Sequence, residues 1–274
     1  MRIEDVDRAR EVPGAADSML RTLEAFGLGW DGPVLRQSTR RDAYEAALAR
    51  LAEHGKTYRC SCTRAEVAAA ARVAPAPPVG HRRGFPAGPA ETRYAGTCRS
   101  NPQHPDARLA VRFLTHGYGA VTVRDRVQPP LVENVEAVTG DFVLRRRDGF
   151  YAYQLAVVVD DGAQGITDIV RGLDLYDNTP RQRVLQLALG LAAPTYLHLP
   201  LVVERSGTKL SKSHRAVPAD PAQAPALLSA LLRWLRHPPP EMLRNSPVEH
   251  QLAWAKAHWN PSLLQGVTTV SSTD

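Results

Sequence analysis

The sequence contains few lysines and few cysteines, and it has no long apolar run. No apolar stretch approaches the 18 residues that a membrane-spanning helix requires. The first segment, MRIEDVDRAR, is charged and has no apolar core, so it differs from a secretory signal. We therefore expect a cytoplasmic protein that has no membrane partner.

Cysteine occurs only three times in 274 residues. An odd count in a chain without a secretory signal argues against a disulfide framework and favours free thiols or a metal site. Cys60 and Cys62 form a C-x-C pair, and Cys98 lies 36 residues further on. Three thiolates and one more ligand would complete a tetrahedral zinc site, whereas three buried free cysteines are the alternative.

Lysine is rarer still, since only four of the 34 Lys and Arg residues are lysines. Two of them, Lys209 and Lys212, lie three residues apart in SGTKLSKSH. A lysine ammonium is a compact charge on a flexible stem, which suits contact with a triphosphate that moves during reaction. The alternative is a solvated surface turn. The net charge of +6 is compatible with a nucleic-acid partner, although a general bias toward arginine would also produce it.

The hydrophobic pattern predicts an α/β protein. We expect strands near 57–62, 109–113, 121–125, 141–145, 166–170 and 196–203, and helices near 16–28, 39–54, 180–191, 221–235 and 247–258. Residues 72–90 are so rich in proline and glycine that we expect a loop without regular structure. The tail over 267–274 is predicted to be disordered.

Three stretches carry a family resemblance. KLSKS resembles the KMSKS signature of class I aminoacyl-tRNA synthetases, and the segments that begin at RIEDVDRAR and AYQLAVVVDD resemble the glutamyl branch of that class. The resemblance runs from residue 2 to about 260 and is strongest to the glutamyl-Q tRNA(Asp) synthetase family. It implies that the chain activates L-glutamate with ATP and Mg²⁺ and transfers the glutamate to the queuosine base in the anticodon of tRNA(Asp).

The resemblance also assigns site residues. It implies that Glu4, Tyr153 and Arg171 bind L-glutamate, that Lys212 binds ATP, and that Lys209 assists Lys212 in catalysis. Taken alone, Glu4 would more simply be a surface acid, Tyr153 a core aromatic residue, and Arg171 one half of an ion pair. The spacing of Tyr153 and Arg171 within two matching segments favours the functional interpretation.

The same family has a structural Zn²⁺ module, and the resemblance assigns its ligands to Cys60, Cys62, Tyr94 and Cys98. Tyrosine is an unusual zinc ligand, so His81 and His104 are alternatives for the fourth position. The insertion over 72–90 lengthens the gap between Cys62 and Tyr94, and we expect it to loop out and leave the ligands together.

The implied fold is a class I Rossmann-type parallel sheet with an inserted zinc-binding and acceptor-binding-like subdomain. Its predicted parts are 1–56 and 146–218 for the catalytic domain, 57–145 for the insertion, 219–266 for C-terminal helices, and 267–274 for the tail. The HIGH-like motif, which forms the other half of the ATP site in this class, does not occur in the chain. We therefore expect the first strand and helix to be missing because the start codon was assigned too late, and we expect no glutamate activation without them.

Two other functions stay open from the sequence. The chain is a fragment of a glutamyl-tRNA synthetase that charges the tRNA 3′ end, or it is a non-catalytic paralogue that binds tRNA. The expected partners in the preferred interpretation are tRNA(Asp), L-glutamate and ATP, and the expected state is a monomer.

Overall fold

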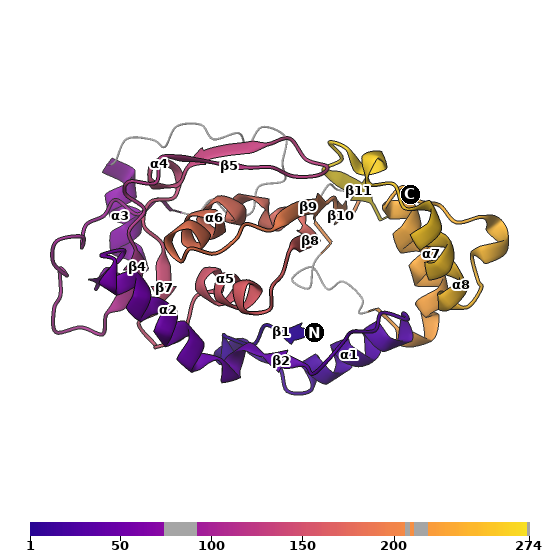
Figure 1. Ribbon diagram of the computed structural model, residues 1–274, viewed down its shortest axis with the longest axis horizontal. Helices are drawn as coiled ribbons and strands as arrows, with labels where there is room; N and C mark the ends of the chain where they lie inside the picture. The colour runs from indigo at the N-terminus through magenta and orange to yellow at the C-terminus, as the bar shows by residue number, and fades with distance from the viewer. Residues whose placement is uncertain (74–91, 206–208, 211–218, 273–274) are drawn as a thin grey trace.

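The computed structural model describes residues 1–73, 92–205, 209–210 and 219–272 (Figure 1). Its helices are α1 Ala15–Ala25, α2 Arg41–Glu53, α3 Arg64–Val73, α4 Val135–Val138, α5 Tyr153–Ala163, α6 Thr179–Ala188, α7 Ala224–Trp234 and α8 Val248–His258. Its strands are β1 Arg2–Ile3, β2 Leu35–Arg36, β3 Thr57–Cys60, β4 Ala110–Phe113, β5 Ala120–Val123, β6 Leu131–Asn134, β7 Val143–Arg145, β8 Asp168–Gly172, β9 Thr195–Leu199, β10 Leu201–Val203 and β11 Thr269–Ser271. Each predicted helix and strand overlaps an observed one.

The strands fall into parallel pairs and antiparallel groups. β1–β2, β8–β9 and β10–β11 are parallel pairs, while β3–β4–β7 and β5–β6 are antiparallel. The prediction of parallel strands is confirmed. Within the described ranges the parallel pairs do not join into one sheet, because β1 and β8 are not hydrogen-bonded to each other and a pocket lies between them.

The largest core joins α2, α5 and α6 to the antiparallel sheet β3–β4–β7. Tyr44, Leu48 and Leu51 lie on one face of α2, as the helical spacing predicts, and all three are buried. They pack with residues of α5, α6, β4 and β7 in a single cluster. Figure 1 shows α5 and α6 in the middle of the molecule, with α3 on the left side and α7 and α8 on the right.

The C-terminal helices close a second core with the end of α1. Phe26 is buried against Leu228 of α7 and Val248 of α8. Gly27 follows with φ +68°, and a Cβ there would approach Leu252 Cδ1 to 3.0 Å. A glycine is therefore required both for the left-handed turn and for the close approach of α8.

Two expectations need correction, and one helix was not predicted. The tail over 267–274 is not disordered throughout, because β11 pairs with β10 and the Leu201 amide donates to the Thr268 carbonyl at 2.9 Å. The loop predicted over 72–90 begins later, since Arg72 still belongs to α3. That helix escaped prediction although Thr63 and Glu66 form a capping box at its start, with Thr63 N donating to Glu66 Oε2 at 2.7 Å. Residues 74–91 lie outside the described part of the chain.

In the part of the chain that the structure describes, no helix is both long and apolar enough to cross a bilayer.

Candidate active site and metal centre

A pocket of about 400 Å³ lies between β1, α5 and β8. Among the described residues β8 is hydrogen-bonded to β9 alone, so its other edge faces this pocket. The pocket contains the three residues predicted to bind glutamate: Glu4 just after β1, Tyr153 at the start of α5, and Arg171 on β8. The structure thus brings together side chains that are separated by up to 167 positions in the sequence.

Arg171 is held by groups on three elements. Its Nε donates to His198 Nε2 at 3.0 Å, and its Nη2 donates to Thr179 Oγ1 at 2.9 Å and to the Leu175 carbonyl at 3.3 Å. These bonds occupy Nε and Nη2 and leave Nη1 for a ligand. A guanidinium in this arrangement can donate to a carboxylate in the pocket.

His198 and Asp125 form a buried pair behind Arg171. His198 Nδ1 lies 2.6 Å from Asp125 Oδ2, and both side chains are fully buried. Burial lowers the pKa of His198, and the Asp125 carboxylate only partly opposes this shift. Burial would raise the pKa of Asp125, but hydrogen bonds from His198 and from the Val127 and Gln128 amides outweigh it and lower that pKa. The pair is therefore a carboxylate beside a neutral imidazole.

Carboxylates form the opposite wall of the pocket. Arg2 lies between two of them, with Nη1 2.8 Å from Asp161 Oδ1 and Nη2 3.0 Å from Glu4 Oε1. Burial raises the pKa of Asp161, and the Arg2 charge opposes that rise. One arginine is shared by two acids, so this wall has an excess of negative charge that suits an ammonium group.

Tyr153 lies between these two walls. Burial raises the pKa of its phenol, while the neighbouring Arg171 charge opposes the rise. The hydroxyl therefore stays protonated at neutral pH and is able to donate or accept a hydrogen bond. Asp160, the residue before Asp161 on α5, does not line the pocket and instead accepts hydrogen bonds from Gln37, Arg40 and Tyr44.

The lysine pair is only partly described. Lys209 Nζ lies 2.5 Å from Asp174 Oδ2, and its backbone forms a bridge with Val203 at the end of β10. Lys209 is therefore tied to the segment that follows Arg171, but it is not a lining residue of the 400 Å³ pocket. Lys212 lies outside the described residues.

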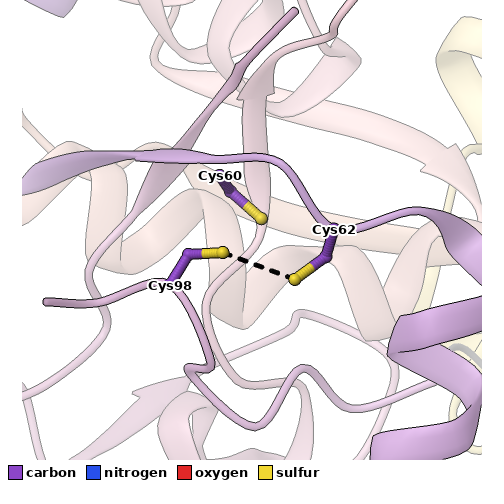
Figure 2. A group of neighbouring side chains, drawn as sticks. All are labelled: Cys60, Cys62 and Cys98. Carbon is purple, nitrogen blue, oxygen red and sulfur yellow. Dashed lines mark hydrogen bonds between the residues drawn. The ribbon is translucent and has the colours of Figure 1, made fainter. Parts of the chain in front are cut away.

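The three cysteines converge at the end of β3. The Sγ atoms of Cys60, Cys62 and Cys98 all lie within 4.8 Å of one another, and Figure 2 shows them pointing to a common centre. The Tyr94 hydroxyl lies 3.4 Å from Cys60 Sγ and 3.6 Å from Cys62 Sγ. The predicted ligand set is thus assembled, because Tyr94 pairs with Gly140 in a β-bridge that carries its ring toward β3.

Of the two alternative fourth ligands, the structure describes His104 alone. His104 Nε2 lies 2.8 Å from Glu66 Oε1, and the metal-ligand group found among the described residues contains the three cysteines without His104. His81 lies outside the described residues. The geometry therefore favours Tyr94 over His104 as the fourth group.

Arg112 adds positive charge beside the thiols. Its Nε donates to Cys60 Sγ at 3.2 Å, and its guanidinium lies 3.7 Å from the centre of the Tyr94 ring. Burial opposes ionisation of Cys98, but the Gln103 and Ser61 amides and neighbouring side chains outweigh it and lower the pKa of its thiol to about 6. Three thiols and a phenol in a buried, positively flanked cluster are a donor set that fits Zn²⁺.

Three residues in or behind the pocket escaped the sequence reasoning: Arg2, which lines it, and Asp125 and His198, which lie behind Arg171. His198 could have been recognised from the sequence, because it is a histidine within the apolar strand segment YLHLPLVV. A polar side chain in a buried strand requires a hydrogen-bond partner. The signal does not name that partner, since Asp125 lies 73 positions away.

The chain matches the family described as tRNA synthetases class I (E and Q), catalytic domain, over residues 1–224. It is 43% identical to a glutamyl-Q tRNA(Asp) synthetase of Ectopseudomonas mendocina over 260 residues, covering 95% of this chain and 81% of the relative. It is 47% identical to one of Xanthomonas axonopodis pv. citri over 266 residues, covering 96% of this chain and 80% of the relative.

Two solved structures share the fold. A glutamate tRNA ligase from Elizabethkingia meningosepticum, solved with its amino acid, superimposes with a TM-score of 0.71 at 21% identity. A glutamate–tRNA synthetase from Elizabethkingia anophelis gives 0.73 at 22%. Each match covers 99% of this chain but only 60% and 61% of those longer proteins. From the family match and the 43–47% identity, the chain belongs to the class I aminoacyl-tRNA synthetase ligases, and among them to the glutamyl-Q tRNA(Asp) synthetase family.

Proposed function

We propose that this protein activates L-glutamate with ATP and transfers the glutamate to the queuosine base in the anticodon of tRNA(Asp). The observation that carries the proposal is the pocket between β1 and β8, which places two acids opposite a fixed arginine. Glutamate is complementary to that arrangement because it has one ammonium and two carboxylates. The names of relatives at 43–47% identity support the choice of acceptor.

In this proposal the acidic wall binds the ammonium group. Glu4 and Asp161 share Arg2, so an incoming ammonium supplies the positive charge that two carboxylates lack. Arg171 binds a carboxylate of glutamate through Nη1, and the neutral Tyr153 hydroxyl lies beside it. The pocket then presents the remaining carboxylate for reaction with ATP.

The lysines act on the other substrate. Lys209 and Lys212 are proposed to bind the phosphates of ATP, which enters with Mg²⁺, and to stabilise the charge on the departing pyrophosphate. The Asp174 carboxylate holds Lys209 in the free protein, so this ion pair exchanges for phosphate when ATP binds. An exposed pair of this kind is weak enough to exchange readily.

Zn²⁺ is proposed to have a structural role. Cys60, Cys62, Cys98 and Tyr94 would hold it, and when bound it would supply a rigid link between β3 and the segment around Tyr94. Four protein ligands leave no open position for a substrate, which separates this centre from the chemistry.

The test measures glutamate-dependent exchange of pyrophosphate into ATP, followed by transfer of labelled glutamate to tRNA(Asp) with and without queuosine. Both this chain and a version extended upstream in frame are assayed, because the family resemblance implies that a HIGH-like segment supplies the second half of the ATP site. Transfer only to queuosine-containing tRNA supports the proposal. Ester formation at the tRNA 3′ end would instead indicate a glutamyl-tRNA synthetase, and tRNA binding without exchange in either version would indicate a non-catalytic paralogue.

A further inference from the structure

We infer that His198, held by Asp125, is a positioning residue that fixes the guanidinium of Arg171 in the orientation needed to bind a substrate carboxylate. The inference rests on the proposed function in one respect, which is that the ligand of Arg171 is L-glutamate. The fixed geometry of Arg171 is a property of the free protein and is tested separately below.

The strand register brings the two residues together. β8 and β9 run parallel, and Arg171 is the direct partner of His198 in their ladder. The side chains of paired residues lie on the same face of a sheet, so the Arg171 Nε reaches His198 Nε2 at 3.0 Å. A shift of one residue would replace His198 by Leu197 or Leu199, neither of which accepts a hydrogen bond.

The partners determine the tautomer of His198. An arginine Nε is always protonated, so His198 Nε2 must be the acceptor. His198 Nδ1 therefore carries the proton and donates to Asp125 Oδ2 at 2.6 Å. Asp125 is itself fixed, because its Oδ1 accepts from the Val127 and Gln128 amides at 3.0 and 2.9 Å. A continuous series of hydrogen bonds thus links the Val127 and Gln128 amides, through Asp125 and the His198 imidazole, to the Arg171 guanidinium.

The surroundings of His198 keep its imidazole away from the pocket, of which it is not a lining residue. His198 is fully buried. Tyr176 meets the ring edge-on at 5.0 Å, Tyr196 stacks on it at 6.0 Å, and Thr179 Oγ1 lies 3.5 Å from Nε2. The charged groups that act on the ring are Asp125, Arg171 and, at longer range, Asp174. A side chain enclosed in this way acts on the pocket through Arg171 and not by direct contact with a substrate.

A protonated His198 would reverse this effect. Two N–H groups would then face each other at Arg171 Nε, and two positive charges would be adjacent. The guanidinium would turn away from the ring or lose its fixed orientation. Glutamate affinity is therefore expected to fall at acid pH through His198, and a neutral acceptor at this position should remove that part of the pH dependence.

The test compares His198→Gln, His198→Ala and the matched control His237→Gln in the full chain. Gln keeps a neutral acceptor at position 198, whereas Ala removes it. His237 is also buried, with Nδ1 2.6 Å from the Leu235 carbonyl and Nε2 accepting from the Asn260 amide at 2.8 Å. It lies outside the pocket, so its replacement reports the cost of losing a buried histidine alone.

Two measurements are made on each variant. Calorimetric titration with L-glutamate should show a dissociation constant about tenfold higher in His198→Ala, which is the order expected for one lost hydrogen bond to a charged group. His198→Gln and the control should stay within about threefold of the starting protein. Nitrogen NMR should show His198 Nε2 as an unprotonated acceptor at pH 7 and the Arg171 Nε–H protected from exchange, with that protection lost in His198→Ala.

The two readouts separate the failures. If the unmodified protein binds no glutamate while the NMR signals are as expected, the proposed ligand is wrong and the fixed Arg171 stands. If His198→Ala binds glutamate as tightly as the control, or if Arg171 Nε–H exchanges freely in the unmodified protein, the positioning role is overturned.

Discussion

Asp160 offers a direct test of how α2 is held against α5. Its carboxylate is fully buried and accepts hydrogen bonds from Gln37 Nε2 at 2.9 Å, Arg40 Nε at 3.0 Å and Tyr44 Oη at 2.7 Å. The perturbations are Asp160→Ala, which removes all three acceptor contacts, and Asp160→Asn, which keeps the volume and one acceptor oxygen.

The magnitude follows from what each donor loses. Gln37 and Tyr44 are each 1% exposed, so water does not replace the carboxylate, and a buried donor without a partner costs about 1–3 kcal/mol. The Arg40 side chain is 26% exposed and regains water, so its share is smaller. We expect Asp160→Ala to lower the free energy of unfolding by about 3–5 kcal/mol, and Asp160→Asn by about 1–3 kcal/mol.

The assay is urea unfolding followed by tryptophan fluorescence at neutral pH. With a slope of about 1–3 kcal/mol per molar urea, the midpoint of Asp160→Ala should fall by at least about 1 M. Glu241→Gln is the matched control, because Glu241 forms an exposed pair with Arg244 at 3.1 Å and its loss should change the midpoint little. If Asp160→Ala unfolds at the same urea concentration as this control, the network does not hold the two helices and the reasoning fails.

Three other outcomes are expected. Gly140→Ala should lower the zinc content of the purified protein, because Gly140 has φ +73° and a Cβ there would lie 2.2 Å from the Tyr94 carbonyl oxygen. Metal analysis checks this, with Gly165→Ala as the control, because a Cβ at Gly165 meets nothing within 4 Å. Arg171→Lys should raise the glutamate dissociation constant about tenfold or more in calorimetry, since a lysine cannot bond to His198 and a carboxylate in the same fixed geometry. The free energy of unfolding should fall as the pH drops below about 3.8, the ordinary pKa of an aspartate. Burial would raise the pKa of Asp141, but hydrogen bonds from Arg99, Tyr58 and Thr115 lower it. The carboxyl is therefore protonated in the unfolded chain at a pH where it is still ionised in the folded chain, and protons favour unfolding. Asp141→Asn should flatten that fall in urea midpoints measured at pH 5, 4 and 3, and an unchanged slope would contradict the assignment.

Local patterns made much of the fold predictable. Tyr44, Leu48 and Leu51 recur at helical spacing and are buried on one face of α2, and Pro180, where the predicted helix over 180–191 begins, lies in the first turn of α6. β11 could not be predicted in this way, because three residues carry no period and the strand exists through its pairing with β10. Short elements of this kind are determined by their tertiary partner and not by their own sequence.

The candidate site also contains residues that the sequence predicted and residues that it did not. The family resemblance predicted Glu4, Tyr153 and Arg171 as glutamate-binding residues, and all three line one pocket. The same motifs did not indicate Asp125, because what makes it relevant is a contact across 73 positions. A single sequence contains the residues of a buried polar network but not their pairing.

The register of β8 and β9 explains why the pocket depends on the core beneath it. Arg171 faces His198 only while the ladder keeps Ile169 opposite Tyr196 and Gly172 opposite Leu199. Tyr196 is buried in a cluster with Leu173 and Leu201, so apolar packing opposes any slip of β9, which would turn these side chains toward the other face. The contact between His198 and Arg171 therefore depends on apolar packing of Leu173, Tyr196 and Leu201, which do not line the pocket. Substitutions in that cluster should act on glutamate affinity as well as on stability, whereas substitutions in the α7–α8 core should act on stability alone.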